Sequence, residues 1–425
     1  MKLKTIFIIS WLLFTASAAT AQPSIELPPE EPKQAIPRVP MLQLQRENQI
    51  EVPLYQPAPA NSTAIGGYGE LTFNAPSNGP NIVDMRRMVL FIGHNFTDKL
   101  RFYGELELEH AITSASDVGE FELEQAFLDY LAWKPLNFRA GVILIPMGII
   151  NIYHEPSTFN GVDRPETDTV IIPSTWREPG AGVFGDVRGL RYQAYVINGF
   201  KANGFTASNG VRDGHQEAAL ALGHDWGLIA RADYGLPFLY KYRITADVGA
   251  SFYYSHADQG QALFKGAEGD SVPVTMLDVD LRLRTRGLEF RGELATAWIG
   301  GIHRLNRALA DAALAAMTTF EGPVAHQLIG GYVELGYNVL HPLKLRSGLQ
   351  LVPFLRYEHV DTQYQLPSDL ARAPGNNRDI VTAGLTFRPI AEIALKFDYQ
   401  RVSTDATAAA DQNIDRYNVG LAFMF

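Results

Sequence analysis

The C-terminal segment 414–425 limits most strongly what this chain can fold into. Two sets of residues alternate along it: Tyr417, Val419, Leu421, Phe423 and Phe425 are apolar, and Arg416, Asn418, Gly420, Ala422 and Met424 lie between them. Successive side chains of a strand point to opposite faces, so the first set forms one apolar face. The printed chain ends on that face, and a strand bordered by lipid needs no protein to cover it. We therefore expect a membrane-embedded strand.

The same alternation recurs along the chain and predicts about sixteen strands. We expect them over 65–73, 82–96, 100–111, 120–133, 138–145, 182–187, 190–198, a poorly defined segment within 217–238, 242–255, 274–286, 288–298, 326–339, 349–360, 379–387, 393–402 and 414–425. Most are near the roughly ten residues that cross a bilayer at a tilt. Short turns such as Arg188-Gly189 and Arg286-Gly287 alternate with long loops. An even strand number places both chain ends on the periplasmic side.

A soluble β-sandwich would also alternate apolar and polar residues, but three features favour a barrel in a membrane. The polar faces carry charges of both signs along whole strands, as a water-filled lumen allows. Tyr254, Trp298, Tyr357 and Phe425 are expected near strand ends, where an interfacial aromatic girdle would lie. The loops alternate in length. The predicted fold class is all-β, a transmembrane antiparallel β-barrel with a long inward-folding loop.

The N-terminal part of the chain predicts export to the bacterial outer membrane. Residues 1–21 have a basic start, an apolar run and the small-residue site Ala19-Thr20-Ala21, so we expect a signal peptide cleaved after Ala21. Residues 22–62 are Pro-rich and predict a periplasmic linker, either a spacer or an arm that contacts a partner. They are too short and too Pro-rich for the plug of an energised transporter. The barrel is expected over 63–425. The chain has no cysteine, which excludes disulfides and thiolate chemistry.

The segment 146–179 is the longest connection on the outer side, and a loop this long is usually functional. The residues around it are Phe127-Leu128-Asp129-Tyr130, Phe138-Arg139-Ala140-Gly141, Ile145-Pro146-Met147-Gly148, Thr175-Trp176-Arg177-Glu178-Pro179-Gly180 and the following 180–185. In these segments the chain resembles porins of the phosphate-selective O and P family. The resemblance implies a sixteen-stranded, trimeric, water-filled channel whose lumen is narrowed by this loop. The phosphate selectivity of that family rests on a run of Lys and Arg along the lumen.

Here the residues expected to line the pore are of both signs, so phosphate selectivity does not follow. They are Arg101, Glu105, Glu107, Arg139, Arg191, Arg243, Asp247, Asp278, Asp280, Arg282, Arg284, Glu289, Arg291, Glu293, Arg356 and Glu358. The candidates for the constriction loop are Glu155, Asp163, Arg164, Glu166, Asp168 and Arg177. A pore lined in this way would sort small hydrophilic solutes or ions, anions among them, by width and charge. The alternative is that the loop charges pair with each other and hold the loop against the wall.

Other classes of function find less support. His154-Glu155 has no second histidine at helical spacing, so no metal site is predicted. No nucleophile elbow or phosphate-binding glycine loop is present, and we expect no enzyme, no cofactor and no nucleic-acid partner. A surface receptor or binding barrel without an open pore is the alternative to a channel. The Ala-rich segment 304–319 predicts a short helix in an outer loop, which would suit such a role. The expected partners are outer-membrane lipid and further copies of the chain.

Overall fold

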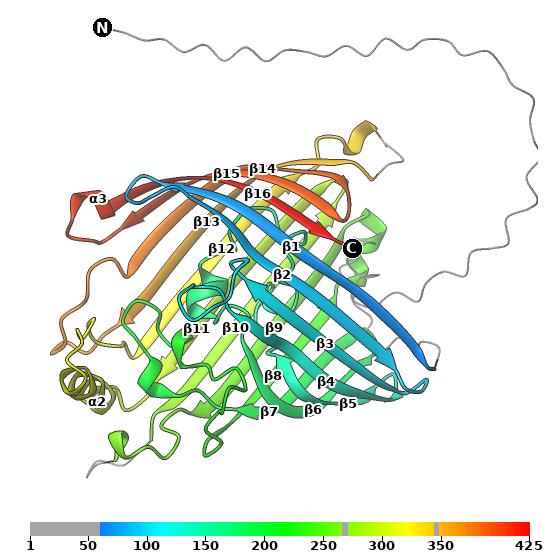
Figure 1. The fold of residues 1–425 in the computed structure, drawn as a ribbon. Coiled ribbons are helices and arrows are strands. Elements are labelled where there is room, and N and C mark those ends of the chain that lie inside the picture. The colour runs from blue at the N-terminus through cyan, green and yellow to red at the C-terminus, as the bar shows by residue number, and fades with distance from the viewer. Residues whose placement is uncertain (1–59, 266–270, 344–347) are drawn as a thin grey trace, which may run out of the picture. The chain divides into compact units, whose positions relative to one another are not determined.

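The computed structural model describes residues 60–265, 271–343 and 348–425. The described strands form one closed antiparallel barrel in which each strand pairs with its neighbours in sequence and β1 pairs with β16 (Figure 1). This confirms the predicted fold class and strand number. The expected signal peptide and nearly all of the expected linker lie outside the described residues.

The sixteen strands follow one another around the barrel. They are β1 (Ser62–Pro76), β2 (Ile82–Asn95), β3 (Leu100–Glu109), β4 (Phe121–Trp133), β5 (Leu136–Leu144), β6 (Arg177–Val187), β7 (Leu190–Asn198), β8 (Trp226–Gly235), β9 (Thr245–His256), β10 (Pro273–Thr285), β11 (Leu288–Ile299), β12 (Gln327–Tyr337), β13 (Gln350–Gln365), β14 (Asn377–Ile390), β15 (Ile393–Thr404) and β16 (Asn413–Met424).

Helical segments occur only in the connections between the described strands. The α-helices are α2 (Ile302–Ala315) and α3 (Ala409–Gln412), a π-helical turn spans Thr167–Ile171, and 3-10 turns span Ala202–Gly204, Arg212–Gly214, Pro237–Tyr242, Ala262–Phe264 and His341–Leu343. Helix α2 confirms the helix predicted over 304–319. None of the helices in the described part of the chain is long and apolar enough to cross a bilayer.

Tight turns join the strands at one end of the barrel. In Arg188-Gly189 and Arg286-Gly287 both residues have positive φ, 55° and 88° in the first and 47° and 86° in the second. That conformation is the type I′ turn, whose twist matches the strands it joins, and glycine adopts it without a Cβ clash. The predicted alternation of loop lengths is not strict at this end. The connections 236–244 and 338–349 contain 3-10 turns and are longer than two-residue hairpins.

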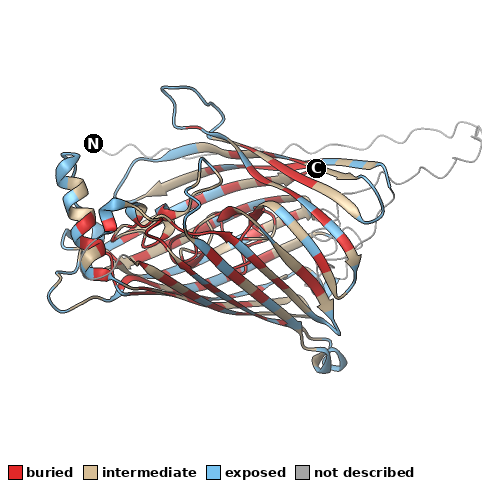
Figure 2. Ribbon diagram, turned by 90° about the horizontal axis from the view of Figure 1, so that it is seen from below, coloured by how far each residue is buried: buried red, intermediate tan, exposed pale blue. Residues whose placement is uncertain are grey.

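Burial alternates along the strands as the sequence predicts (Figure 2). Exposed apolar residues cover the outside of the barrel; they include Leu277 and Val279 on β10, Leu294 on β11, Val333 and Leu335 on β12, and Phe397 on β15. Charged and polar side chains lie inside. The expected aromatic girdle is wrong for Tyr357, because β13 extends to Gln365 and places this residue at mid-strand.

Several predicted strand boundaries also need correction, and those of β6 and β9 change the place of candidate site residues. Pro237–Tyr242 forms a 3-10 turn and Arg243 follows it with a φ of 60°, so β9 begins at Thr245 rather than at 242. Arg243 is therefore an exposed turn residue and does not line a pore. Strand β6 begins at Arg177, which places Arg177 on the barrel wall rather than in the loop. The poorly defined segment resolves into β8.

The barrel closes where the start of β1 meets the end of the chain. The backbone N–H of Gly67 donates to the carbonyl of Phe425 at 3.0 Å, and the N–H of Phe425 donates to the carbonyl of Gly67 at 2.9 Å. A Cβ on Gly67 would lie 2.4 Å from the Val89 carbonyl oxygen and 2.8 Å from the Phe425 ring. Only glycine allows this close approach.

We expect Gly67→Val to weaken the closure of the barrel, because the new side chain would overpack the seam by about 1–3 kcal/mol. The midpoint of thermal unfolding should fall by roughly 3–8 °C, measured by heat-modifiable mobility on gels. Gly223→Val is the matched control, since a Cβ there would meet nothing within 4 Å. Equal midpoints for the two variants would contradict this account of the seam.

Candidate functional site

The connection between β5 and β6, residues 145–176, lies inside the barrel. Its apolar residues Ile145, Met147, Ile171, Ile172 and Trp176 are fully buried. Its turn over Thr167–Ile171 contacts β11, β12 and β13, and other parts of it bond to strands on the opposite wall. The long inward-folding loop is thus present in the structure.

Acidic residues of the wall hold the loop by its backbone N–H groups. The N–H of Val162 donates to Asp398 on β15 at 2.6 Å, and the N–H of Glu166 donates to Glu358 on β13 at 2.7 Å. The N–H of Ile149 donates to Glu293 on β11 at 3.2 Å. Each of these contacts satisfies a backbone N–H group that the loop would otherwise bury without a partner, so together they fix the course of the loop.

Basic residues of the wall hold the loop by its carbonyl groups. Lys396 on β15 donates to the carbonyl of Gly161 at 2.8 Å. Arg291 on β11 donates to the carbonyl of Thr158 at 2.6 Å, and Arg388 on β14 reaches the carbonyl of Ser157 at 3.3 Å. Charged residues of both signs on the wall therefore hold the loop in place. The sequence alternative also expects charges to hold the loop against the wall, but it assigns that role to the charges of the loop itself.

Between the loop and the wall remains a polar cavity of about 240 Å³. Its lining comes from β2, β3, the loop and β13 to β16: Arg86, Arg87, Glu109, Asp163, Arg164, Glu166, Thr169, Ser174, Thr175, Arg356, Glu358, Ile380, Gln400 and Arg416. Five arginines and four carboxylates share this space. We refer to it below as the arginine cavity.

Arg164 differs in its partners from Arg86, Arg87 and Arg356, each of which pairs with a carboxylate. It donates to the hydroxyls of Ser174 at 3.0 Å and Thr175 at 2.9 Å, and no carboxylate of the described residues forms an ion pair with it. By contrast, Arg86 pairs with Asp163 at 2.8 Å. Burial, and then the charge of Arg87, lower the pKa of Arg164 to about 10. A guanidinium held in this way would be stabilised by an anion in the cavity.

The structure places most of the sixteen predicted pore residues on inner faces of strands, but in ion pairs. Asp129 accepts from both Arg101 and Arg139, Arg191 pairs with Asp247, and Arg231 joins Asp233, Asp278 and Asp280. Arg282 pairs with Asp233, Arg284 with Glu289, and Arg356 with Glu334 and Glu358. Glu105 and Glu107 lie in a separate buried cluster. Of the predicted set, Arg356 and Glu358 line the arginine cavity.

The six candidates for the constriction loop divide into two groups. Asp163, Arg164 and Glu166 line the arginine cavity. Glu155 and Asp168 are buried against the wall, and Arg177, on β6, bonds to Glu122. The first group lines the arginine cavity, and the second does not.

Sequence analysis missed Arg86, Arg87, Glu109 and Arg416. Arg86 and Arg87 are neighbours, so strict alternation would send one of them to the lipid. A β-bulge prevents this: Glu70 pairs with Arg87 and Leu71 pairs with Met85, which leaves Arg86 as the extra residue. A bulge re-aims a side chain, and here it lets both arginines line the cavity.

Comparison with known proteins defines the class to which this fold belongs. OmpF of Salmonella typhi in complex with daunomycin matches with a TM-score of 0.55 at 12% identity, over 86% of this chain and 98% of that chain. The outer membrane channel DcaP of Acinetobacter baumannii matches with a TM-score of 0.52 at 12% identity, over 86% of this chain and 98% of that chain. An anion-selective porin from Comamonas acidovorans matches with a TM-score of 0.51 at 10% identity, over 86% of this chain and 100% of that chain. The chain has the fold of the sixteen-stranded porins.

One relative is close enough to define a family. An uncharacterized protein of Aquifex aeolicus (strain VF5) is 33% identical over 367 residues, which span 85% of this chain and 80% of the relative. The chain belongs to the same family as that protein. No family model matches the sequence.

Asp168 gives the loop a dependence on pH. Burial, followed by the charges of Asp278 and Glu358, raises the pKa of this loop carboxyl from 3.8 to about 8. The unfolded chain therefore releases this proton at lower pH than the folded chain does. Its contribution to stability falls as the pH rises from about 4 to about 8, and is constant above that range.

We expect Asp168→Asn, which resembles the neutral carboxyl, to raise the midpoint of thermal unfolding at pH 9 by roughly 2–5 °C and to leave it unchanged below pH 4. Unfolding would be followed by gel mobility across this pH range. The exposed residue Asp98 supplies a control, Asp98→Asn, with no expected effect at either pH. A loss of stability in Asp168→Asn at pH 9 would show that the ionised carboxylate is the stabilising form.

Proposed function

We propose that this protein is an outer-membrane channel for passive diffusion of small hydrophilic solutes or ions. The observation that carries the proposal is the loop 145–176, which folds into a closed barrel with the porin fold and leaves a polar cavity beside it. A pore narrowed in this way excludes solutes by width and sorts ions by the charges around its narrowest part. The apolar outer face supports a position in lipid.

The charges of the cavity support small anions as the preferred solutes. Arg164 has hydroxyl partners, and Arg87 lies beside it, so the loop and β2 together present positive charge. Guanidinium groups hold a fixed charge and offer forked donors, which suit oxyanions and carboxylates. The Comamonas porin of similar fold is described as anion-selective, which agrees with this preference.

The resemblance to the phosphate-selective O and P family extends the proposal to a homotrimer. Phosphate as the particular solute has less support, because Glu109, Asp163, Glu166 and Glu358 line the same cavity. Carboxylates near the path would repel a doubly charged phosphate more than a singly charged anion. We therefore propose small monovalent anions, organic acids included.

A binding barrel without an open pore is the second candidate. The observation in its favour is the size of the cavity, about 240 Å³, beside a loop most of whose apolar residues are buried. A space of this size suits one small bound molecule as well as a narrow passage.

Single-channel recording in a planar bilayer under a KCl gradient tests the proposal. The refolded full-length protein should give discrete conductance steps with a reversal potential on the anion side. Arg164→Gln should lower the ratio of anion to cation permeability by roughly twofold or more, because it removes a charge beside the path, and Arg164→Lys should largely retain the ratio.

Arg401→Gln is the control, since Arg401 on β15 pairs with Asp415 away from the cavity and should not affect selectivity. A cation-side potential in the wild type would contradict anion preference. Folded protein, established by heat-modifiable mobility, that gives no steps would contradict the channel and favour the binding barrel.

A further inference from the structure

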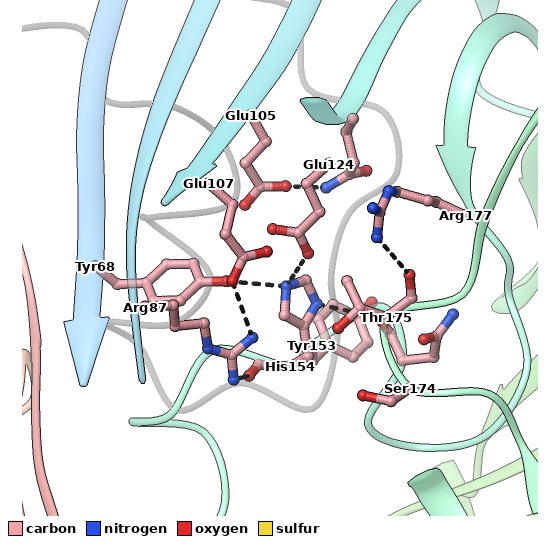
Figure 3. A network of polar contacts seen from close by, with 12 residues as sticks. Tyr68, Arg87, Glu105, Glu107, Glu124, Tyr153, His154, Ser174, Thr175 and Arg177 are labelled. Carbon is pink, nitrogen blue, oxygen red and sulfur yellow. Dashed lines mark hydrogen bonds and ion pairs between the residues drawn. The ribbon is translucent and has the colours of Figure 1, made fainter. Parts of the chain in front are cut away.

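A second polar cluster lies inside the barrel, where the loop meets β3 and β4 (Figure 3). Glu105 and Glu107 are two apart on β3 and therefore share its inner face. Glu124 joins them because β4 carries a bulge: Glu105 pairs with Gln125 and Leu106 pairs with Leu123, leaving Glu124 as the extra residue. Glu124 and its neighbour Gln125 are consequently both buried inside. We call Glu105, Glu107, Glu124 and His154 the glutamate cluster.

The glutamate cluster brings three almost fully buried carboxyl groups close together. The exposed fraction is 0% for Glu105, 2% for Glu107 and 0% for Glu124. Arg87 lies 4.0 Å from Glu107 and is also bonded to Glu70 at 2.7 Å. Gln125 donates to one oxygen of Glu105, and the other oxygen has no hydrogen-bond partner among the described residues.

Glu124 is the least satisfied member. Neither of its carboxylate oxygens accepts a hydrogen bond from the described residues outside the cluster, and its contacts within the cluster are His154 and the carboxyl group of Glu107. A buried, ionised carboxylate without donors is costly, and such a group needs a proton or a cation. The cluster thus contains a polar side chain that is fully buried and directed at a shared point.

His154 from the loop completes the donor set. Its Nδ1 lies 3.1 Å from the carbonyl oxygen of Asn151, which can only accept, so Nδ1 carries a hydrogen. In the neutral ring Nε2 then has a free lone pair. That atom lies 2.5 Å from Glu124 Oε1 and 3.0 Å from the hydroxyl of Tyr68. A histidine oriented by a carbonyl through one nitrogen, with the other facing carboxylates, has the arrangement typical of metal ligands.

We propose that Glu105, Glu124 and His154 bind one divalent transition-metal ion of the zinc type. One ligand atom from each residue lies within 4.8 Å of the others. Ligands at about 2.0–2.2 Å from one zinc ion lie within this span of one another. Two carboxylates neutralise the charge of the ion, and the imidazole favours zinc-like metals over magnesium or calcium.

Such an ion would join the loop to two strands of the wall, because His154 belongs to the loop while the glutamates belong to β3 and β4. The inference is independent of the proposed channel, since a barrel without conductance would bind the ion equally well. The sequence gives little sign of this site. His154 and Glu155 are adjacent in the sequence, whereas the proposed partners of His154 come from β3 and β4.

The test uses full-length, refolded protein without a histidine tag, treated with a chelator and then dialysed. Isothermal titration with ZnCl₂ should show about one ion per chain with micromolar or tighter affinity, and elemental analysis after dialysis should give the same ratio. Glu124→Gln, which is isosteric, and His154→Gln should each weaken binding by roughly tenfold or more. Zinc should raise the thermal midpoint of the wild type but not that of Glu124→Gln.

Glu334→Gln is the matched control, because Glu334 is a buried acid on β12 outside the cluster and should leave zinc affinity unchanged. A Co²⁺ titration of the wild type does not depend on any variant folding. Strong visible bands of a four- or five-coordinate site would support the proposal. Absence of stoichiometric binding by folded wild type, or wild-type affinity in Glu124→Gln, would overturn it and leave a proton shared between Glu124 and His154.

Discussion

The structure depends on one constraint, that backbone polar groups facing lipid must be paired within the protein. The pairing of β1 with β16 meets it by leaving the ring of strands without an edge. Closure then assigns every second side chain to lipid and the rest to the lumen. Charged residues can occupy the inner positions only if water, other charges or the loop satisfy them. The features specific to this protein follow from the partners that these inner charged side chains find.

The loop 145–176 satisfies a large part of the inner charge. Acids of the wall accept its N–H groups, and bases of the wall donate to its carbonyls. A long loop loses much conformational entropy when it is fixed, and charge-assisted hydrogen bonds in a partly dry lumen offset that loss. Removing one partner of such a contact would leave a buried charge unsatisfied, at a cost of several kcal/mol. The inner charges thus stabilise the loop, and those that line the arginine cavity also border the space beside it.

The sequence was sufficient for the barrel and not for the site. Alternation with period two is a local signal, and it identified the strands, most of their boundaries and the inner position of charges such as Asp280 and Glu293. It failed at Arg243, where the Pro237–Tyr242 turn delays the strand. The loop residues were identified as a group, but which of them face the cavity depends on contacts with strands far away in sequence. Asp163 and Asp168 are five residues apart in the loop, yet Asp163 lines the arginine cavity and Asp168 is buried against the wall. No local sequence pattern distinguishes the two environments.

The most informative residues are those that interrupt the alternation. Bulges at Arg86 and at Glu124 each turn an additional charged side chain inward, and a residue at a bulge is invisible to a search for period two. The first bulge adds to the arginine cavity and the second to the glutamate cluster. Arg87 lies between the two, because it lines the cavity and also bonds to Glu70 and the carbonyl of His154. Arg87 therefore connects the arginine cavity to the glutamate cluster, through the loop backbone at His154.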